Sequence, residues 1–246
     1  MHATLFSAVG PRASVAVLPV TLGNRLRGCQ RRCGERREEK FNTHAYEVTI
    51  HSLRPATAPR AIAALQSPLT SGPGKLLACW YSEIGALNQI LVIREYESDR
   101  DLAAQREALG SNDNPFGINE FVESSGSDTF LSFPFIEAMK AGSGQGPYFE
   151  VRTYRLKPSG VPRTMELWKK HLPERIKLSS PLAAMYSVTG IVPRFMHVWP
   201  YPSLDERHRI RSKSVETGVW PPPGGPDHIE TMQSDIYLAA AFSPIR

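Results

Sequence analysis

An internal repeat is the feature that most constrains what this chain can fold into. Residues 46–55 (YEVTIHSLRP) match residues 149–158 (FEVRTYRLKP) at an offset of 103. Later matches keep the same order: Gly85 with Gly190 at an offset of 105, and Ser127-Asp128 with Ser234-Asp235 at an offset of 107. Because the order is kept while the offset grows in small steps, the pattern indicates two copies of one unit with short insertions in the loops.

Each copy spans about 95 residues and carries the same order of predicted elements. In the second copy, a strand of alternating polarity (148–156) precedes a helix whose apolar side chains recur every three or four residues (165–176). Two strands (183–189 and 194–201), a helix that begins at Ser203 and a final apolar strand (236–242) follow. This β-α-β-β-α-β order is that of the ferredoxin-like unit. We therefore expect domains at 41–140 and 148–246, joined by a Gly/Ser-rich linker (141–147) and preceded by a separate segment (1–40).

A single ferredoxin-like unit has both helices on one face of its sheet, which leaves the other face bare. The second copy offers an equivalent face that can cover it. The sequence therefore predicts an α+β fold, in which two tandem ferredoxin-like (βαββαβ) units pack sheet against sheet as an intrachain dimeric α/β barrel.

The net charge of +5 belongs to the N-terminal segment and not to the repeated body. Residues 1–34 contain five arginines and no acidic residue, which leaves 24 basic and 24 acidic residues in 35–246. Binding of nucleic acid needs a basic face on the folded body, so nucleic acid is not an expected partner.

Three cysteines are too few for a disulfide framework. The longest uncharged run near the start (13–24) is too short for a bilayer span of about 20 residues, so we expect a soluble, intracellular protein without a transmembrane segment.

Residues 1–40 carry arginine and serine but no acidic residue before Glu35, which is the composition of an organellar transit peptide. A disordered leader or tail, or a spurious translation start, explains the same composition. Under each interpretation the segment stands outside the fold. We expect a cytoplasmic protein, with the mitochondrial matrix as the alternative if the segment is a transit peptide.

Strand alternation gathers the chemically interesting side chains of the second copy on one face. Opposite the aliphatic face of strands 148–156 and 194–201 lie Glu150, Arg152, Tyr154, His197, Trp199 and Tyr201. We expect the aliphatic face to meet the helices, so that the polar and aromatic set faces the other sheet. Polar groups are costly to bury without partners, and a few convergent polar groups among aromatic rings are typical of a small pocket.

The candidate catalytic residues are His197, Arg152, Glu150 and Tyr154, and the candidate ligand-binding residues are Trp199, Tyr201, Arg207 and Arg211. Each group has a structural alternative: a buried ion pair, a structural histidine, aromatic packing between the sheets, and a solvated helix face that carries two arginines. The sequence contains no metal-ligand spacing and no Walker, Rossmann or nucleophile-elbow motif. Neither a metal nor a cofactor is therefore predicted.

Two segments of the second copy resemble the NIPSNAP domain: the opening strand 148–158, and the run 197–201 (HVWPY) with Arg207 in the helix after it. The resemblance covers both copies, essentially 45–246. The first copy departs from the pattern at four positions, where tyrosine, arginine, histidine and tryptophan are replaced by His51, Thr49, Val92 and Arg94. A site formed by those residues is therefore expected in the second copy alone.

The resemblance implies a dimeric α/β barrel in a family of largely undefined activity, some of whose eukaryotic members are mitochondrial interaction proteins. The wider fold superfamily includes cofactor-independent oxygenases, haem-degrading enzymes and isomerases. The first hypothesis is a binding or interaction protein, which the lack of a complete catalytic set favours. The alternative is a small-molecule enzyme of the oxygenase or isomerase type, in which Arg152 holds an anionic group and His197 acts as acid and base. The expected partner is a small-molecule or protein ligand, and a homodimer is left open.

Overall fold

The computed structural model describes residues 43–143 and 146–246. The predicted leader (1–40) and the centre of the predicted linker (144–145) lie outside the described residues. The first copy contains β1 (Ala45–Leu53), α1 (Ala58–Ser71), β2 (Lys75–Ile84), β3 (Gln89–Glu95), α2 (Asp99–Gly110) and β4 (Val122–Ser132). The second contains β5 (Tyr148–Leu156), α3 (Gly160–Arg175), β6 (Ala183–Ser187), β7 (Arg194–Tyr201), α4 (Leu204–Glu216), the 3-10 turn η1 (Gly225–His228) and β8 (Ile229–Ala239). Within these ranges, no helix has the length and apolar character needed to cross a membrane.

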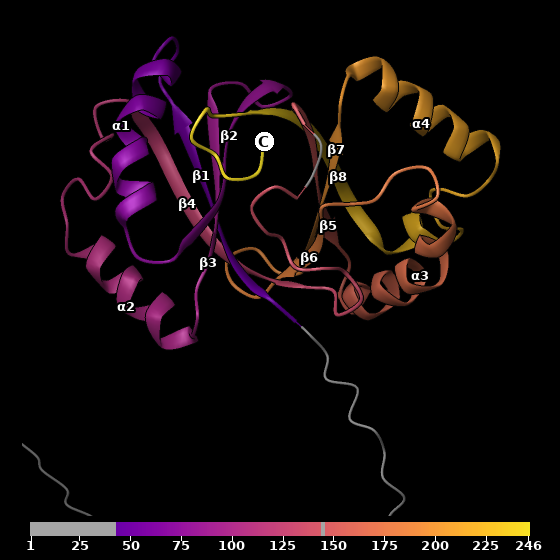
Figure 1. Ribbon diagram of the computed structural model, residues 1–246. Coiled ribbons are helices and arrows are strands. Elements are labelled where there is room, and N and C mark those ends of the chain that lie inside the picture. Colours follow the sequence, from indigo (N-terminus) through magenta and orange to yellow (C-terminus); the bar gives the residue numbers. More distant parts are fainter. Residues whose placement is uncertain (1–42, 144–145) are drawn as a thin grey trace, which may run out of the picture. The chain divides into compact units, whose positions relative to one another are not determined.

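The strands close into one barrel, which confirms the predicted fold class. Their order around the barrel is β1-β3-β2-β8-β5-β7-β6-β4. Each copy supplies a four-stranded antiparallel sheet in ferredoxin-like order, and the two sheets join at both edges through the pairs β2–β8 and β4–β6. The helices lie outside, α1 and α2 on one side and α3 and α4 on the other (Figure 1). Closure of the barrel removes the unpaired edges that each sheet would have alone.

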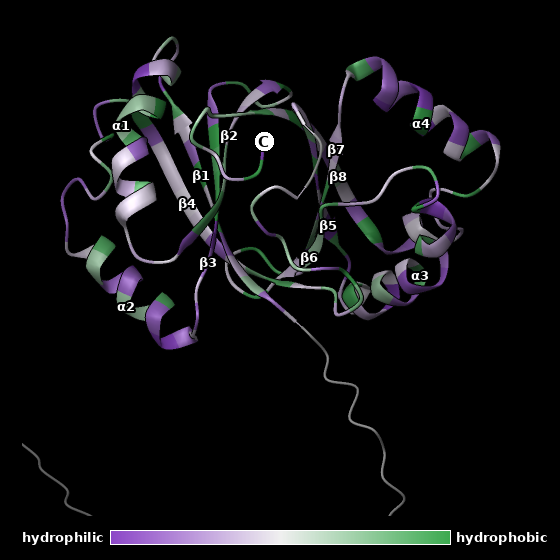
Figure 2. Cartoon of the chain, in the orientation of Figure 1, coloured by the Kyte–Doolittle hydropathy of each residue, from purple (hydrophilic) through white to green (hydrophobic). Residues whose placement is uncertain are grey.

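The interior of the barrel is an apolar core shared by the two copies. It holds Tyr46 and Val48 of β1 and Phe149 and Val151 of β5, together with side chains from other strands. The ring of Trp80 on β2 stacks on that of Phe149, with 4.2 Å between centroids. In Figure 2, β2 contains a hydrophobic (green) stretch, whereas α4 shows long hydrophilic stretches. Since each large side chain buried in this way contributes about 1.5–3 kcal/mol, each copy stabilises the other.

Two glycines and two aspartates of the repeat lie where one copy meets the other. Gly85 follows β2 with φ +108° and lies against Asp235 of β8, whereas Gly190 follows β6 with φ +67° and lies against Asp128 of β4. A Cβ atom on either glycine would overlap the carboxylate beside it. The backbone N–H of Ala86, the residue after Gly85, donates a hydrogen bond to Asp235 at 2.8 Å. Asp128 forms an ion pair with Arg194 of β7. The repeated residues therefore hold each hairpin against the last strand of the other copy.

Helices α2 and α4 each begin at a repeated serine. Ser98 and Ser203 accept hydrogen bonds from the backbone N–H groups of Asp101 and Glu206, at 3.2 and 3.0 Å. This is the N-cap geometry that satisfies an otherwise unpaired donor of the first helical turn. Because the cap fixes the first residue of α4, it also fixes which of its side chains reach the sheet.

Candidate functional site

The alternation of β5 and β7 is as predicted, but the two faces are the reverse of the expectation. The apolar face, which includes Phe149 and Val198, lies in the barrel core. The other face, which includes Tyr154 and Trp199, packs against Trp168 of α3 and against α4. The closed barrel is lined by two sheets and sealed by apolar side chains, whereas the helix layer borders on solvent and accommodates polar groups. The site that we expected between the sheets therefore lies between the second sheet and its helices.

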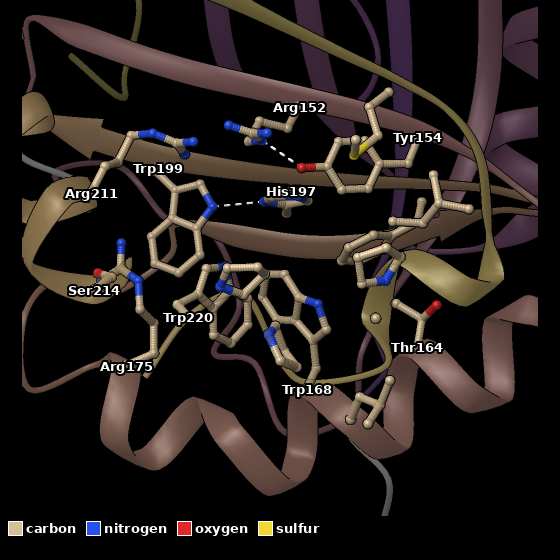
Figure 3. A pocket seen from close by; sticks show the side chains of 18 of the residues that line it. Arg152, Tyr154, Thr164, Trp168, Arg175, His197, Trp199, Arg211, Ser214 and Trp220 are labelled. Atoms are coloured by element: carbon tan, nitrogen blue, oxygen red, sulfur yellow. Dashed lines mark hydrogen bonds between the residues drawn. The ribbon is translucent and has the colours of Figure 1, made fainter. Parts of the chain in front are cut away.

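A cavity of about 240 Å³ lies between this sheet face, helices α3 and α4, and the loop before η1. Half of the residues that line it are arginines or carry aromatic rings (Figure 3); among them are Arg152, Tyr154, Trp168, Arg175, His197, Trp199, Tyr201, Arg211 and Trp220. Val215 and Met232 also line the cavity and are exposed, so the cavity opens to solvent beside them. The volume is slightly below the range of about 300–1,000 Å³ that is typical of ligand pockets. It therefore suits a small molecule better than a large cofactor.

Glu150 is the fully buried centre of an arginine cluster. Its Oε1 accepts hydrogen bonds from Arg152 (2.9 Å), Arg207 (2.7 Å) and Ser234 (2.8 Å), and Arg211 lies 3.6 Å away. Burial alone would raise the pKa of Glu150. The hydrogen bond from Arg207 and the positive charges of Arg211 and Arg152 outweigh burial and lower the pKa to about 2. The ionised carboxylate thereby ties β5 to both α4 and β8.

The cluster carries more positive than negative charge. Three arginines lie within 4 Å of Glu150, and in the described part of the chain no other carboxylate comes that close to any of them. A fourth, Arg175, is 2% exposed and has no carboxylate within 4 Å among the described residues. Its guanidinium donates instead to Ser179, at 2.9 Å to the carbonyl and 2.8 Å to the hydroxyl, and lies 4.2 Å from the ring centre of Trp199. Such a surplus beside a cavity attracts anions.

His197 is held as a neutral hydrogen-bond donor. An indole N–H can only donate, and Nε1 of Trp199 donates to Nδ1 of His197 at 2.6 Å. The proton of the neutral imidazole must therefore lie on Nε2, which is buried and lacks a partner among the described residues. Burial, and after it the charge of Arg152, holds the pKa of His197 well below 6.5. The rings of Tyr154 and Trp168 meet the imidazole edge-on, each with 5.0 Å between centroids.

Tyr154 completes the polar wall. Its hydroxyl accepts a hydrogen bond from Nε of Arg152 at 2.5 Å, which leaves the hydroxyl hydrogen free to be donated. Burial raises the pKa of Tyr154, against the opposing charge of Arg152, so the phenol stays protonated at neutral pH. Arg152 is therefore oriented by two groups at once, Glu150 and Tyr154.

The first copy keeps the strand register of this site but not its chemistry. Arg152 is paired with His197 across β5 and β7, and the corresponding pair across β1 and β3 is Thr49 and Val92. The space between that sheet and α1 is filled by an apolar cluster that includes Leu65. The offset of 103 makes Leu65 the counterpart of Trp168.

One part of the polar network survives in the first copy. Glu47, the counterpart of Glu150, accepts a hydrogen bond from Arg106 of α2 at 2.9 Å. His51 replaces Tyr154; its Nδ1 lies 2.7 Å from the hydroxyl of Ser125. Burial lowers the pKa of His51 to about 4. The carboxylate–arginine link between sheet and helix is therefore common to both copies, whereas the aromatic cavity belongs to the second.

Seven of the eight predicted site residues come together: Tyr154, Arg152, His197, Trp199, Tyr201 and Arg211 on the cavity wall and Glu150 behind it. Arg207 contacts Glu150 but does not line the cavity.

Sequence reasoning missed Arg175 and Trp220, and it treated Trp168 only as part of the apolar pattern of a helix. The interval from Trp168 to Arg175 is two helical turns, which places both on one face, and that spacing was the available signal. Trp220 lies in a Pro/Gly loop, where no periodicity marks the orientation of a side chain.

The described residues contain no group of three or more His, Cys, Asp or Glu side chains arranged to hold a metal ion. The expectation that the protein uses no cofactor stays a prediction.

The fold is shared with solved structures of low sequence identity. A candidate monooxygenase of Fusobacterium nucleatum has a TM-score of 0.57 at 13% identity, with 79% of this chain and 91% of that chain covered. An anthrone oxidase-like protein has a TM-score of 0.56 at 12% identity, with 80% and 91% covered. At such identities the likeness shows the fold alone. The class of protein is thus an α/β barrel built from two ferredoxin-like units.

Sequence comparison then identifies the family. The NIPSNAP family profile matches residues 46–131 and 149–244, once in each copy. The NipSnap homolog of Dictyostelium discoideum is 27% identical over 178 residues, which cover 72% of this chain and 78% of that protein. NipSnap of Drosophila melanogaster is 22% identical over 187 residues, with 71% and 68% covered. The chain belongs to the NIPSNAP family, as the resemblance of its two segments predicted.

Proposed function

We propose that the second copy binds a small organic molecule in the cavity between its sheet and helices α3 and α4. The observation that carries this proposal is the contrast between the two copies. Both form the same barrel, but the first fills the corresponding space with apolar side chains such as Leu65. In the first copy one described arginine, Arg106, pairs with Glu47, whereas three arginines surround Glu150 beside a tryptophan-lined cavity. Closing the barrel does not need this arginine cluster or this cavity, and burying charged groups costs free energy unless a ligand uses them.

Catalysis on the bound molecule is the second candidate function. The two structural neighbours described as a monooxygenase candidate and as anthrone oxidase-like share this barrel, which supports chemistry on an organic substrate. A proton-accepting role for His197 is not part of this proposal, because Nδ1 is occupied by Trp199 and Nε2 carries the proton. In both functions we assign His197 the role of a hydrogen-bond donor. Interaction with a protein partner, the cytoplasmic location and the homodimer stay predictions.

A thermal-shift screen of the full chain tests the proposal, with small organic acids and their neutral analogues as probes. A ligand present at 100 times its Kd adds about 2.7 kcal/mol, which for a chain of this size raises Tm by about 5–10 °C. The control variant is Arg152→Thr/His197→Val, which copies the pair Thr49 and Val92 of the first copy. We expect this variant to fold and to lose the response. The proposal fails if no probe raises Tm, or if the variant responds as the natural chain does.

A further inference from the structure

We infer that the ligand of this cavity is an aryl monocarboxylate of one or two rings, whose carboxylate binds to Arg211 and whose ring lies against the tryptophans. The inference rests on the proposed function and adds the ligand class. It also names Arg211, a candidate ligand-binding residue of the sequence analysis, as the residue that selects this class, in place of Arg152, to which the enzyme hypothesis gave the anionic group.

Arg211 is the arginine of the cluster whose guanidinium donates no hydrogen bond to another described residue. The other three arginines of the site already donate hydrogen bonds to Glu150 or to Ser179. The closest approach of Arg211 to Glu150 is 3.6 Å, which is beyond the usual hydrogen-bond length of about 2.7–3.2 Å. Oε1 of Glu150 already accepts three hydrogen bonds, one of them from Ser234, so that oxygen has little capacity left for Arg211.

Position and geometry make Arg211 suitable for a carboxylate that enters from solvent. Its side chain is 40% exposed and lines the open side of the cavity beside Val215. A planar guanidinium binds a planar carboxylate through two parallel hydrogen bonds. The surplus positive charge of the surrounding arginines strengthens the attraction, because Glu150 is the one described carboxylate within 4 Å of Arg152, Arg207 and Arg211.

The rest of the cavity wall favours a flat ring. Figure 3 shows Arg211, Arg175 and Ser214 toward one end of the cavity, with the tryptophans between them and Thr164. The indoles present both faces and edges: Trp168 and Trp220 meet at 89° with 4.8 Å between centroids, and Trp199 lies 5.9 Å from Trp168. Aromatic rings gain from offset and edge-to-face contacts beyond the area that they bury, whereas an alkyl chain gains from buried area alone.

The size and charge of the site argue against other anions. Inorganic phosphate leaves the aromatic part of the cavity unfilled. A dinucleotide or a haem exceeds a cavity of about 240 Å³. A second carboxylate would have to reach Arg175, which is 2% exposed and already donates to Ser179, so we expect a ligand with one carboxylate.

The test is isothermal titration of the full chain with four probes: 1-naphthoate, its neutral amide, octanoate and inorganic phosphate. A hydrogen-bonded charge pair contributes enough that we expect 1-naphthoate to bind about 10- to 100-fold more tightly than the amide. Arg211→Gln should remove this difference, by weakening the binding of 1-naphthoate by about the same factor. Arg209→Gln is the matched control, because Arg209 lies on the same helix, is exposed and pairs with Glu206.

The possible outcomes separate this inference from the proposed function. Equal binding of 1-naphthoate and its amide, or an Arg211→Gln variant that still distinguishes them, overturns the role of the carboxylate while ligand binding itself stands. Octanoate that binds as tightly as 1-naphthoate overturns the preference for an aromatic ring. Binding of phosphate alone indicates an adventitious ion only, and it overturns the ligand class. If no probe binds and the wider screen is also negative, the proposed function fails together with the inference.

Discussion

At the scale of single residues, Glu150 and His197 are each fixed in one protonation state by their neighbours. Glu150 has no exposed surface, and it stays ionised because arginines and a serine donate to it from three directions. His197 stays neutral because burial and nearby arginines oppose a positive charge. Neither Glu150 nor His197 has to change its ionisation when a ligand enters. Fixed protonation of this kind is a feature of a preorganised binding site.

We predict that the stability contributed by Glu150 is lost as the pH falls from about 4.5 to about 2. The folded-state pKa is about 2 against an ordinary value of 4.5, so in this interval the unfolded chain binds a proton that the folded chain does not. The free energy of unfolding therefore decreases as the pH decreases through the window. Urea unfolding between pH 5 and pH 2.5 measures the change.

Two variants make this measurement specific. Glu150→Gln should be less stable than the natural chain at pH 7, by up to about 3–5 kcal/mol because a partner of a buried pair is lost. Its stability should also vary less with pH in the same window. Glu166→Gln removes an exposed carboxylate on α3 and serves as the control. Equal pH dependence in Glu150→Gln and in the natural chain would contradict the prediction.

We predict that His197 is neutral at pH 7, with its proton on Nε2, and gains a proton only well below pH 6.5. The reason is that its pKa lies well below 6.5 and that Trp199 donates to Nδ1. The ¹⁵N chemical shifts of the labelled imidazole report both the charge and the tautomer. Trp199→Phe removes the indole donor, and we expect it to give a mixture of the two neutral tautomers. A midpoint near 6.5 in the natural chain is the result that counts against this assignment.

At the scale of the elements, the two-residue period of a strand predicted which side chains share a face of the sheet. It did not predict which of the two faces lies inside the barrel. Side chains of β5 and β7 alternate with a period of two, so the grouping of Glu150 with Arg152 and of His197 with Trp199 followed from the sequence. Both faces of the sheet are covered, one by the barrel interior and one by helices. Alternation alone cannot distinguish two covered faces, and the assignment of faces was therefore wrong.

The boundary of the last strand shows the same limit. The sequence predicted a strand that begins at residue 236, where apolar residues become continuous, but β8 begins at Ile229. Its first half is exposed and mostly polar. It forms a strand because its backbone pairs with β5, from Ile229 opposite Leu156 to Leu238 opposite Tyr148. Long-range pairing of this kind overrides local composition. The helices α3 and α4 were easier to place, because the periodicity and the Ser203 cap are local signals.

We predict that Gly85→Ala and Gly190→Ala each destabilise the barrel by more than about 2 kcal/mol. Both glycines have positive φ, which costs a residue with a side chain about 1–2 kcal/mol, and the new methyl group would overlap Asp235 or Asp128. Chemical denaturation of the purified variants measures the loss. Gly126→Ala is the matched control, because Gly126 lies in β4 with ordinary φ and open space around it. Destabilisation of Gly126→Ala to the same extent would show that the clash at the turns is not the cause.

At the scale of the whole molecule, the two copies share the features that form the barrel and differ in the cavity. The barrel core, the glycine–aspartate contacts and the carboxylate–arginine link from sheet to helix occur in both. The aromatic cavity occurs in the second copy. The core and the glycine–aspartate contacts contribute to closing the barrel, which requires both copies, whereas the carboxylate–arginine link holds a helix against the sheet of its own copy. The cavity lies outside the barrel, so its residues can change without opening it, and the first copy shows such a change where Thr49 and Val92 stand.

We predict that the second copy alone (residues 146–246) does not fold as a monomer and that it associates into a dimer. Without the first copy, the apolar face that includes Phe149 and Val198 and the edges β6 and β8 are uncovered. In the full chain β8 pairs with β2 and β6 pairs with β4, and by the repeat β2 and β4 are the counterparts of β6 and β8. Two copies of the fragment can therefore pair β6 with β8 at both seams and close the same barrel.

Sedimentation equilibrium and circular dichroism over a range of concentrations test this prediction. We expect folding and dimer formation to occur together, so that dilution causes unfolding. Gly190→Ala in the fragment should weaken the dimer, because that glycine contacts the last strand of the other copy in the full chain. Gly224→Ala is the control: Gly224 also has positive φ, but its nearest neighbour is within its own loop. A folded fragment that stays monomeric at every concentration would show that the second sheet does not need the first.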